Sequence, residues 1–340
     1  MTKRFTRIGR RIALLCVTAA SLYLLFPSLV AVFSSWRSLR TLDWFWVQLM
    51  IIAELVSFVA VWQLQRIALQ RRGWFAVATA QLSATAFGRI VPGGGATAGA
   101  FEVTLLGRTG AAPVRVGAAL ASASALQFAA LLALPVLAVP AIVGSVPVDR
   151  GLAVAAYLGA AVLVLLLSAG AVAFLTNRPL VAVGEAAQWV LNRTIRRRRP
   201  VHDLPAKLLV ERAFVRSTIG ARWAAAVCTA VAVPAFDYLA LLCALHAVGA
   251  QARPSLVLLA YVAAALLGTI PLTPGGLGFV EAGLVGLLAL AGVDAGPAVT
   301  ATLAYRLVAF WLPIPIGGIA YLLFRHRYMP QPAAMPRPTR

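Results

Sequence analysis

Residues 88–102 read GRIVPGGGATAGAFE and lie between two strongly apolar segments. Proline lacks a backbone N–H and glycine is costly inside a helix, so the run PGGG at 92–95 is expected to interrupt any helix that contains it. In the hydrocarbon core of a bilayer, a backbone group without a partner is costly unless it lines a cavity or is buried in protein. The stretch is therefore either a surface loop or a deliberate break at membrane depth.

The composition indicates a polytopic membrane protein. Of the 340 residues, 61% are hydrophobic and only 12% are charged, against about a quarter charged in soluble domains. The formal charge of +20 comes from residues clustered at the ends of apolar segments, which is typical of membrane topology and argues against nucleic-acid binding. Cys16, Cys228 and Cys243 lie in apolar segments without motif spacing, so the sequence predicts no disulfide, no metal site and no cofactor.

Six apolar segments are long enough to cross a bilayer, and two further segments are split. Full crossings are expected at about 12–33, 45–67, 116–146, 151–175, 222–247 and 298–324. The first of these is too long for the hydrophobic part of a signal peptide. Two other regions, at about 74–107 and 255–292, are each divided by Pro-Gly-Gly into halves of roughly 13–17 residues. Such halves are too short to span a bilayer alone.

The distribution of basic residues predicts the topology. Lys and Arg gather at the N-terminus, after the second crossing and after the last, and the segment 176–222 has ten basic and three acidic residues. Because basic residues favour cytoplasmic loops, both termini are expected in the cytoplasm of a multi-pass cell-membrane protein. Arg71, Arg72, Arg108 and Arg115 flank the first split region on both sides. That region is therefore expected to enter from the cytoplasm and return there, whereas the second begins and ends outside.

The two split regions resemble each other. GRIVPGGG at 88–95 is similar to GTIPLTPGGLG at 268–278, and a glutamate follows each, Glu102 and Glu281. Broken helices related by an inverted repeat are a common design of transporters. The sequence predicts an all-α membrane protein with about six transmembrane helices and two re-entrant hairpins of opposite orientation, although short Gly/Pro matches also arise by chance.

An acid in the helix before each break supports the repeat. Glu54 precedes Pro92 by 38 residues, and Asp237 precedes Pro274 by 37. The spacing therefore nearly repeats, which supports an inverted repeat.

One transmembrane domain is expected over 1–325, with a basic cytoplasmic loop at about 176–221 and a disordered tail at 326–340. Within the loop, 179–195 has the pattern of an amphipathic interfacial helix. The four arginines Arg196 to Arg199 follow it, and beside a membrane each would attract anionic lipid by about 1 kcal/mol. A role in fixing the topology is an equally good interpretation of this cluster.

Ionisable residues inside apolar segments are the candidate functional residues, because their burial in a membrane is costly. Arg306 is expected to pair with Glu281 or Asp237 from another helix, and purely structural pairing is the alternative role. The half-helices after the breaks would direct N–H groups at an anionic ligand such as a lipid phosphate, unless Glu281 caps those groups itself. The sequence predicts no catalytic residue and a substrate-binding cavity formed by Glu54, Pro92, Gly93, Gly94, Glu102, Asp237, Pro274, Gly275, Gly276, Gly278, Glu281 and Arg306.

Longer motifs resemble a known family. PLTPGGLGFVEAGLVGLLALAGV (271–293), followed by AYRLVAFWLPIPIGG (304–318), resembles the transmembrane domain of lysylphosphatidylglycerol synthases and the flippase-like UPF0104-type proteins that carry this domain alone. GRIVPGGGATAGAFEVTLLGRTG (88–110) is similar to the family's first glycine-rich motif, although Gly95-Ala96-Thr97 replaces Leu-Gly-Gly. The resemblance covers nearly the whole chain.

The resemblance implies lipid translocation. In the synthases this domain is associated with moving aminoacylated phospholipid between leaflets, while a cytoplasmic domain attaches the amino acid. Since no such catalytic portion is recognised here, we expect no aminoacyl transfer.

Three hypotheses for the function follow. The first is a non-enzymatic flippase that moves an anionic or lipid-linked substrate, a phospholipid or a polyprenyl-linked lipid, between the leaflets of the cytoplasmic membrane. The second is a membrane-embedded glycosyl or phosphoryl transferase, for which the predicted outside loops offer only the isolated acids Asp43, Asp149 and Asp294. The third is a partner subunit that positions another membrane enzyme.

Overall fold

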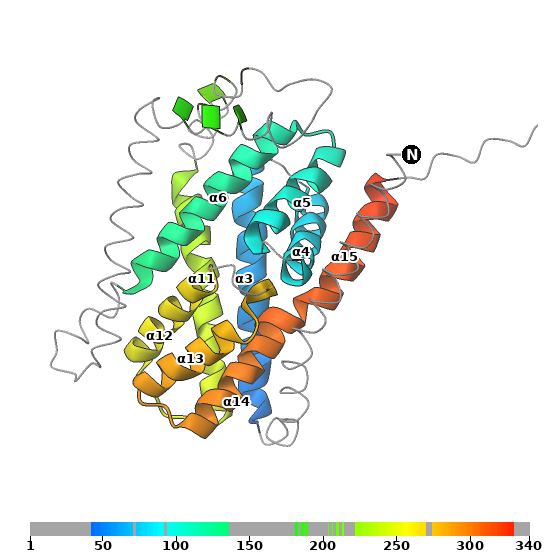
Figure 1. Ribbon diagram of the computed structural model, residues 1–340. Coiled ribbons are helices and arrows are strands. Elements are labelled where there is room, and N and C mark those ends of the chain that lie inside the picture. The colour runs from blue at the N-terminus through cyan, green and yellow to red at the C-terminus, as the bar shows by residue number, and fades with distance from the viewer. Residues whose placement is uncertain are drawn as a thin grey trace, which may run out of the picture.

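The computed structural model describes residues 42–70, 73–91, 94–135, 222–269 and 274–329, with scattered positions between 181 and 213. These residues form helices and no strand, as the sequence predicts (Figure 1). In chain order the helices are α3 (Trp44–Leu69), α4 (Trp74–Ile90), α5 (Gly94–Arg108), α6 (Pro113–Ala133), α11 (Trp223–Ala247), α12 (Pro254–Leu267), η2 (Pro274–Gly276), α13 (Phe279–Leu290), α14 (Ala295–Arg306), η3 (Leu307–Trp311) and α15 (Pro313–Tyr328).

Four helical stretches in this part of the chain are long and apolar enough to cross a membrane. They are Trp44–Leu69, Pro113–Ala133, Trp223–Ala247 and the run Ala295–Tyr328. They coincide with four of the six predicted crossings. The other two, 12–33 and 151–175, lie outside the described residues, as do Arg196 to Arg199, most of the predicted interfacial helix and residues 330–340 of the predicted tail. The first residues of that tail continue helix α15 to Tyr328 and are not disordered.

Each split region forms a pair of short helices. Helices α4 and α5 have 17 and 15 residues, and α12 and α13 have 14 and 12. At 1.5 Å per residue they are about 18–26 Å long, shorter than the ~30 Å hydrocarbon core. The members of each pair pack on each other. Figure 1 shows the α4–α5 pair beside the second half of α3 and the α12–α13 pair beside its first half.

The central element is the antiparallel pair of α3 and α11. The Asp43 N–H donates to the Ala247 carbonyl at 3.0 Å, and the Ser57 hydroxyl donates to the Val233 carbonyl at 3.0 Å. In both contacts the two residue numbers add to 290, so the register places Glu54 opposite residue 236. Small buried residues such as Ala53 let the two backbones approach closely, as is common between membrane helices.

The last predicted crossing is interrupted by a π-helical turn. Helix α14 continues through the π-helical segment η3 into α15, and the Leu312 N–H bonds to the carbonyl of Leu307 at 2.9 Å, five residues earlier. Pro313 has no N–H, so the carbonyl of Ala309, four residues before it, lacks its usual helical donor. The predicted span at 298–324 therefore has the correct extent but is not a regular α-helix.

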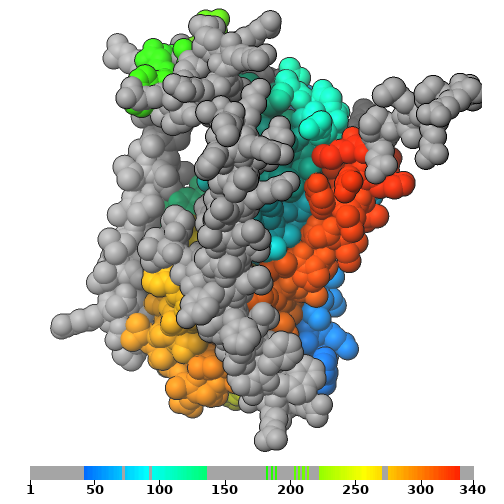
Figure 2. Space-filling model, turned by 45° about the vertical axis from the view of Figure 1, so that its right-hand side comes forward, coloured from blue at the N-terminus to red at the C-terminus, as the bar shows by residue number. Residues whose placement is uncertain are grey.

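Helix α15 packs against α4 through a glycine, and Figure 2 shows the two helices side by side in cyan and orange-red. A Cβ at Gly317 would clash with the Leu82 carbonyl oxygen and lie 2.5 Å from the Ala86 methyl, whereas a Cβ at Gly318 would meet nothing within 4 Å. We expect Gly317→Ala to lower the free energy of unfolding by about 1–3 kcal/mol, the usual cost of overpacking.

Gly318→Ala is the matched control, and it should leave stability unchanged or raise it slightly, because alanine favours helix more than glycine does. Thermal unfolding of both variants in detergent measures the difference. Equal unfolding temperatures would show that the α4–α15 contact tolerates a methyl group.

Candidate functional site

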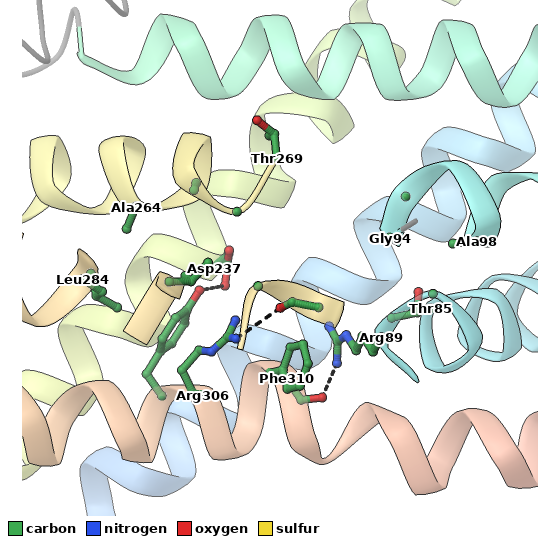
Figure 3. A pocket seen from close by; sticks show the side chains of 18 of the residues that line it. Thr85, Arg89, Gly94, Ala98, Asp237, Ala264, Thr269, Leu284, Arg306 and Phe310 are labelled. Atoms are coloured by element: carbon green, nitrogen blue, oxygen red, sulfur yellow. Dashed lines mark hydrogen bonds between the residues drawn. The ribbon is translucent and has the colours of Figure 1, made fainter. Parts of the chain in front are cut away.

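A cavity of about 710 Å³ lies where the two short-helix pairs meet. Gly94 and Gly95 at the start of α5 line it from one pair, and Gly275 and Gly276 in η2 line it from the other. Figure 3 labels Gly94 beside Arg89 and Phe310 at this cavity. Segment η2 also contacts α4 directly. Glycines that belong to the two breaks, far apart in the sequence, therefore face one shared space.

Close packing explains why glycines occupy the tip of the second pair. Gly275, Gly276 and Gly278 have φ of +61°, +71° and +76°, in the left-handed region that glycine adopts freely. A Cβ on Gly275 would lie 2.5 Å from the Phe310 ring and 3.2 Å from the Arg89 carbonyl oxygen. The tip is thus wedged between α4 and the π-helical segment, and only the backbone fits there.

Asp237 connects four helices at the wall of the cavity. The Tyr261 hydroxyl donates to its Oδ2 at 2.8 Å, and the Tyr305 hydroxyl donates to its Oδ1 at 2.6 Å. The side chain of Glu54, from α3, faces Asp237 across the α3–α11 interface, close enough for the two carboxyl groups to interact. Asp237 in α11 therefore holds α3, α12 and α14 together through polar contacts.

Arg306 forms the ion pair expected of it. Its Nε donates to Oε1 of Glu281 at 2.8 Å, and its Nη2 lies 2.8 Å from the same oxygen. Nη2 also donates to the Gly275 carbonyl at 3.4 Å. Of the two predicted partners, Glu281 is the correct one, because Asp237 is occupied by tyrosines. The pair joins α14 to α13 and fixes the glycine tip between them.

Arg89 is a site residue that sequence reasoning missed. Its Nη1 donates to the Phe310 carbonyl and its Nη2 to the Ala309 carbonyl at 2.8 Å. The latter is the carbonyl that Pro313 leaves without a helical donor. The Arg89 and Arg306 guanidinium carbons lie 4.9 Å and 4.3 Å from the centre of the Phe310 ring (Figure 3). A charged residue inside an apolar half-helix was the signal that could have identified it.

The structure does not bring all the predicted residues together. Glu102 in α5 is buried and contacts Gln65 of α3, and it does not line the cavity. Pro274 and Gly278 flank the cavity-lining glycines of the second tip. Pro92 and Gly93 lie outside the described residues. Within the described ranges, no group of three or more His, Cys, Asp and Glu side chains could hold a metal ion.

The Arg306–Glu281 pair is expected to contribute strongly to stability. Both side chains are largely buried, with exposed fractions of 11% and 15%. Arg306→Met leaves the Glu281 carboxylate without its counter-charge, and breaking a buried pair in this way costs about 3–5 kcal/mol. The double variant Arg306→Met with Glu281→Gln should recover part of that loss, since no charge is then left unpaired.

A double-mutant cycle by thermal unfolding in detergent measures the coupling, with exposed Arg325→Met as the control for loss of a cation. If the two single effects simply add, the pair contributes no coupling energy and the prediction is wrong.

Long apolar helices that surround a cavity lined by Arg89, Asp237 and Arg306 define an integral membrane protein with a site inside its helical bundle. Residues 11–317 match the family model described as the lysylphosphatidylglycerol synthase TM region, and the chain belongs to this family. The region is the non-catalytic part of the synthases, which points to a role related to membrane lipid.

One curated relative extends the comparison. A UPF0104 membrane protein of Methanocaldococcus jannaschii is 34% identical over 71 residues, which is 21% of this chain and 30% of that protein. The match thus spans less than a third of the relative's length.

Proposed function

We propose that this protein is a lipid flippase that moves an anionic or lipid-linked substrate between the leaflets of the cell membrane. The observation that carries the proposal is the cavity of about 710 Å³ at the meeting point of the two broken regions. Its size is within the usual ~300–1,000 Å³ of small-molecule sites. A lipid headgroup would enter this cavity while the hydrocarbon chains stay among the apolar helix faces.

The chemistry of the lining supports a negatively charged headgroup. Gly94 and Gly95 bring the first turn of α5 to the cavity wall, and the first N–H groups of a helix have no partner within it and favour anions. Arg89 and Arg306 line the same cavity. The cluster Arg196 to Arg199 forms part of the proposal as a collector of anionic lipid near the cytoplasmic surface.

The arrangement of the helices supports alternating access. The order of long helix, short pair and long helix occurs in α3–α6 and again from α11 to the continuous run α14–α15, and α3 and α11 run antiparallel. We infer an inverted repeat in which α4–α5 is a re-entrant hairpin from the cytoplasm and α12–α13 is one from outside. Transporters of this kind bind their substrate where such hairpins meet.

Leaflet exchange in reconstituted vesicles tests the proposal. The purified protein is placed in phosphatidylcholine vesicles that contain fluorescently labelled phosphatidylglycerol or a labelled polyprenyl phosphate. Membrane-impermeant reductant then quenches only the label that reaches the outer leaflet. We expect at least one of the two lipids to exchange faster than in protein-free vesicles. Rates equal to those of protein-free vesicles for both lipids would contradict the proposal.

The topology has its own test. In a background without the three cysteines, single cysteines replace Thr109, next to Arg108, and Asp294, which are both near helix ends. We expect position 109 to react with a membrane-impermeant thiol reagent only from the cytoplasmic side and position 294 only from outside. The reverse pattern, or reaction of both from one side, would refute opposite hairpins.

A further inference from the structure

We propose that Glu54 and Asp237 form a proton-binding pair through which lipid movement is coupled to the transmembrane proton gradient. The coupling rests on the proposed function, whereas the proton site itself can be tested without it. Nothing in the family membership or in the resemblance of motifs assigns an energy source.

Two helices bring the carboxyl groups together. Glu54 is in the middle of α3 and Asp237 in the middle of α11, and the antiparallel register places Glu54 opposite residue 236, next to Asp237. Their carboxyl groups are therefore close enough to interact directly. Two ionised carboxylates this close repel each other, so the pair is more stable when one of them carries a hydrogen.

The neighbouring donors show which group carries it. Both oxygens of Asp237 accept hydroxyl hydrogens, from Tyr261 and Tyr305, which stabilise a carboxylate. Glu54 Oε2 is buried and has no hydrogen-bond partner among the described residues. An ionised oxygen without a donor is far more costly to bury than the carbonyl oxygen of a neutral acid. The hydrogen therefore belongs on Glu54.

The charges around the pair favour a state in which it carries one proton. Around the pair, α4 contributes Arg89, α12 contributes Tyr261, and α14 contributes Tyr305 and Arg306. Arg306 is neutralised by Glu281 of α13. The Arg89 guanidinium donates to two backbone carbonyls, which are neutral and leave its charge uncompensated. With one proton, the pair has a single negative charge, which the positive charge of Arg89 balances. Without the proton, the pair has two negative charges, and one of them has no counter-charge.

The two sides of the pair differ in their access to water. Asp237 lines the large cavity. Glu54 lines a separate small cavity of about 80 Å³, whose other lining residues are mostly apolar, among them Ile51, Phe58 and Leu312. The proton would thus pass between Glu54 and water in the large cavity by way of Asp237. In this step the Glu54 O–H bond breaks, the proton passes to cavity water, and a carboxylate is left behind.

Electrostatics then couple the proton to an anionic lipid. A phosphate beside Arg89 would neutralise the positive charge of this arginine and place a negative charge near the pair. Both effects would make the pair hold its proton more tightly. By reciprocity the proton would strengthen binding of the phosphate to the same extent. The lipid and the proton would therefore move together, from the acidic side towards the alkaline side.

Infrared difference spectroscopy tests the proton site on the whole protein. Wild type should show the C=O band of the buried Glu54 carboxylic acid at neutral pH. Glu54→Gln should lose this band, though not any absorption from buried Glu102, while staying folded, since the amide keeps a donor towards Asp237. Asp237→Asn, the second variant, should also lose the band, because a lone Glu54 would ionise beside Arg89. Asp294→Asn, at an exposed acid, should retain it. A band that persists in both Glu54→Gln and Asp237→Asn would overturn the site.

Vesicles with a pH difference across the membrane test the coupling. Exchange of labelled phosphatidylglycerol from the acidic to the alkaline side should be several-fold faster than without the gradient, and Glu54→Gln should lose this response. A wild-type rate that ignores the gradient would overturn the coupling. Should wild type move neither labelled lipid while the infrared band behaves as expected, the proton site stands and the proposed transport function fails.

Discussion

Gly95→Leu is expected to reduce lipid exchange to the rate of protein-free vesicles while the protein stays folded. Gly95 lines the cavity at the first turn of α5, and a Cβ there would meet nothing within 4 Å. The leucine side chain would occupy space that the proposed headgroup needs, without displacing a neighbour. In addition, leucine favours helix more than glycine does by about 0.5–1 kcal/mol. Exchange and thermal unfolding are measured on the same preparation.

Gly99→Leu is the matched control. Gly99 lies one turn further along α5 and does not line the cavity, and a Cβ at this position would also meet nothing within 4 Å. The variant should retain wild-type exchange. If Gly95→Leu transports normally, the cavity is not the substrate path. If Gly99→Leu is equally inactive, the effect comes from α5 as a whole.

The sequence alone suggests a different test, leucine at Gly275 and Gly276, with folding expected to survive. The structure overturns that expectation, because a Cβ at Gly275 clashes with Phe310 and one at Gly276 would lie 2.6 Å from the Val280 side chain. Loss of activity in that variant would not separate a blocked cavity from a damaged fold.

Arg89→Leu is expected to be among the most destabilising substitutions in this part of the chain. It removes hydrogen bonds to the carbonyls of Ala309 and Phe310 and the contact with the Phe310 ring. Hydrogen bonds to charged groups contribute about 1.5–3 kcal/mol each, so the free energy of unfolding should fall by at least about 3 kcal/mol. Lipid exchange should be lost as well, because the π-helical segment forms part of the cavity wall.

Arg89→Lys should retain part of the stability, since an ammonium keeps the charge but lacks the planar fork that reaches two carbonyls. Exposed Arg108→Leu, at the end of α5, should change stability little. Unfolding in detergent compares the three variants. Arg89→Leu and Arg108→Leu with the same unfolding temperature would mean that the carbonyl contacts are not stabilising.

The breaks and the buried acids were predictable because their causes are local. Pro-Gly-Gly ends a helix wherever it occurs, so the bounds of the split regions at 74–107 and 255–292 were close to those of α4–α5 and α12–α13. A carboxyl or guanidinium in an apolar segment needs a partner, and this argument identified Glu281 as one of two candidates for Arg306. Such reasoning needs no knowledge of which helices touch.

The sequence did not predict which side of each helix faces the cavity. Helices α3 and α11 are apolar around their whole circumference, so no stripe in the sequence says which side faces the cavity. Glu102 was grouped with Asp237 because a glutamate follows each break, although in the structure it contacts Gln65 instead. The roles of Arg89, Tyr261 and Phe310 likewise depend on long-range packing between α4, α12 and the π-helical segment.

The π-helical turn has a consequence for how the family's sequences can vary. Pro313 removes a donor from the Ala309 carbonyl, and Arg89, 220 positions away, supplies it. In a relative that replaces this proline, the new backbone N–H can donate to the carbonyl, and the arginine is no longer needed there. In a relative that loses only the arginine, the carbonyl has no donor in the membrane interior. Substitutions at these two positions should therefore be inherited together, and their joint changes across lineages would record which ancestors had the interrupted helix.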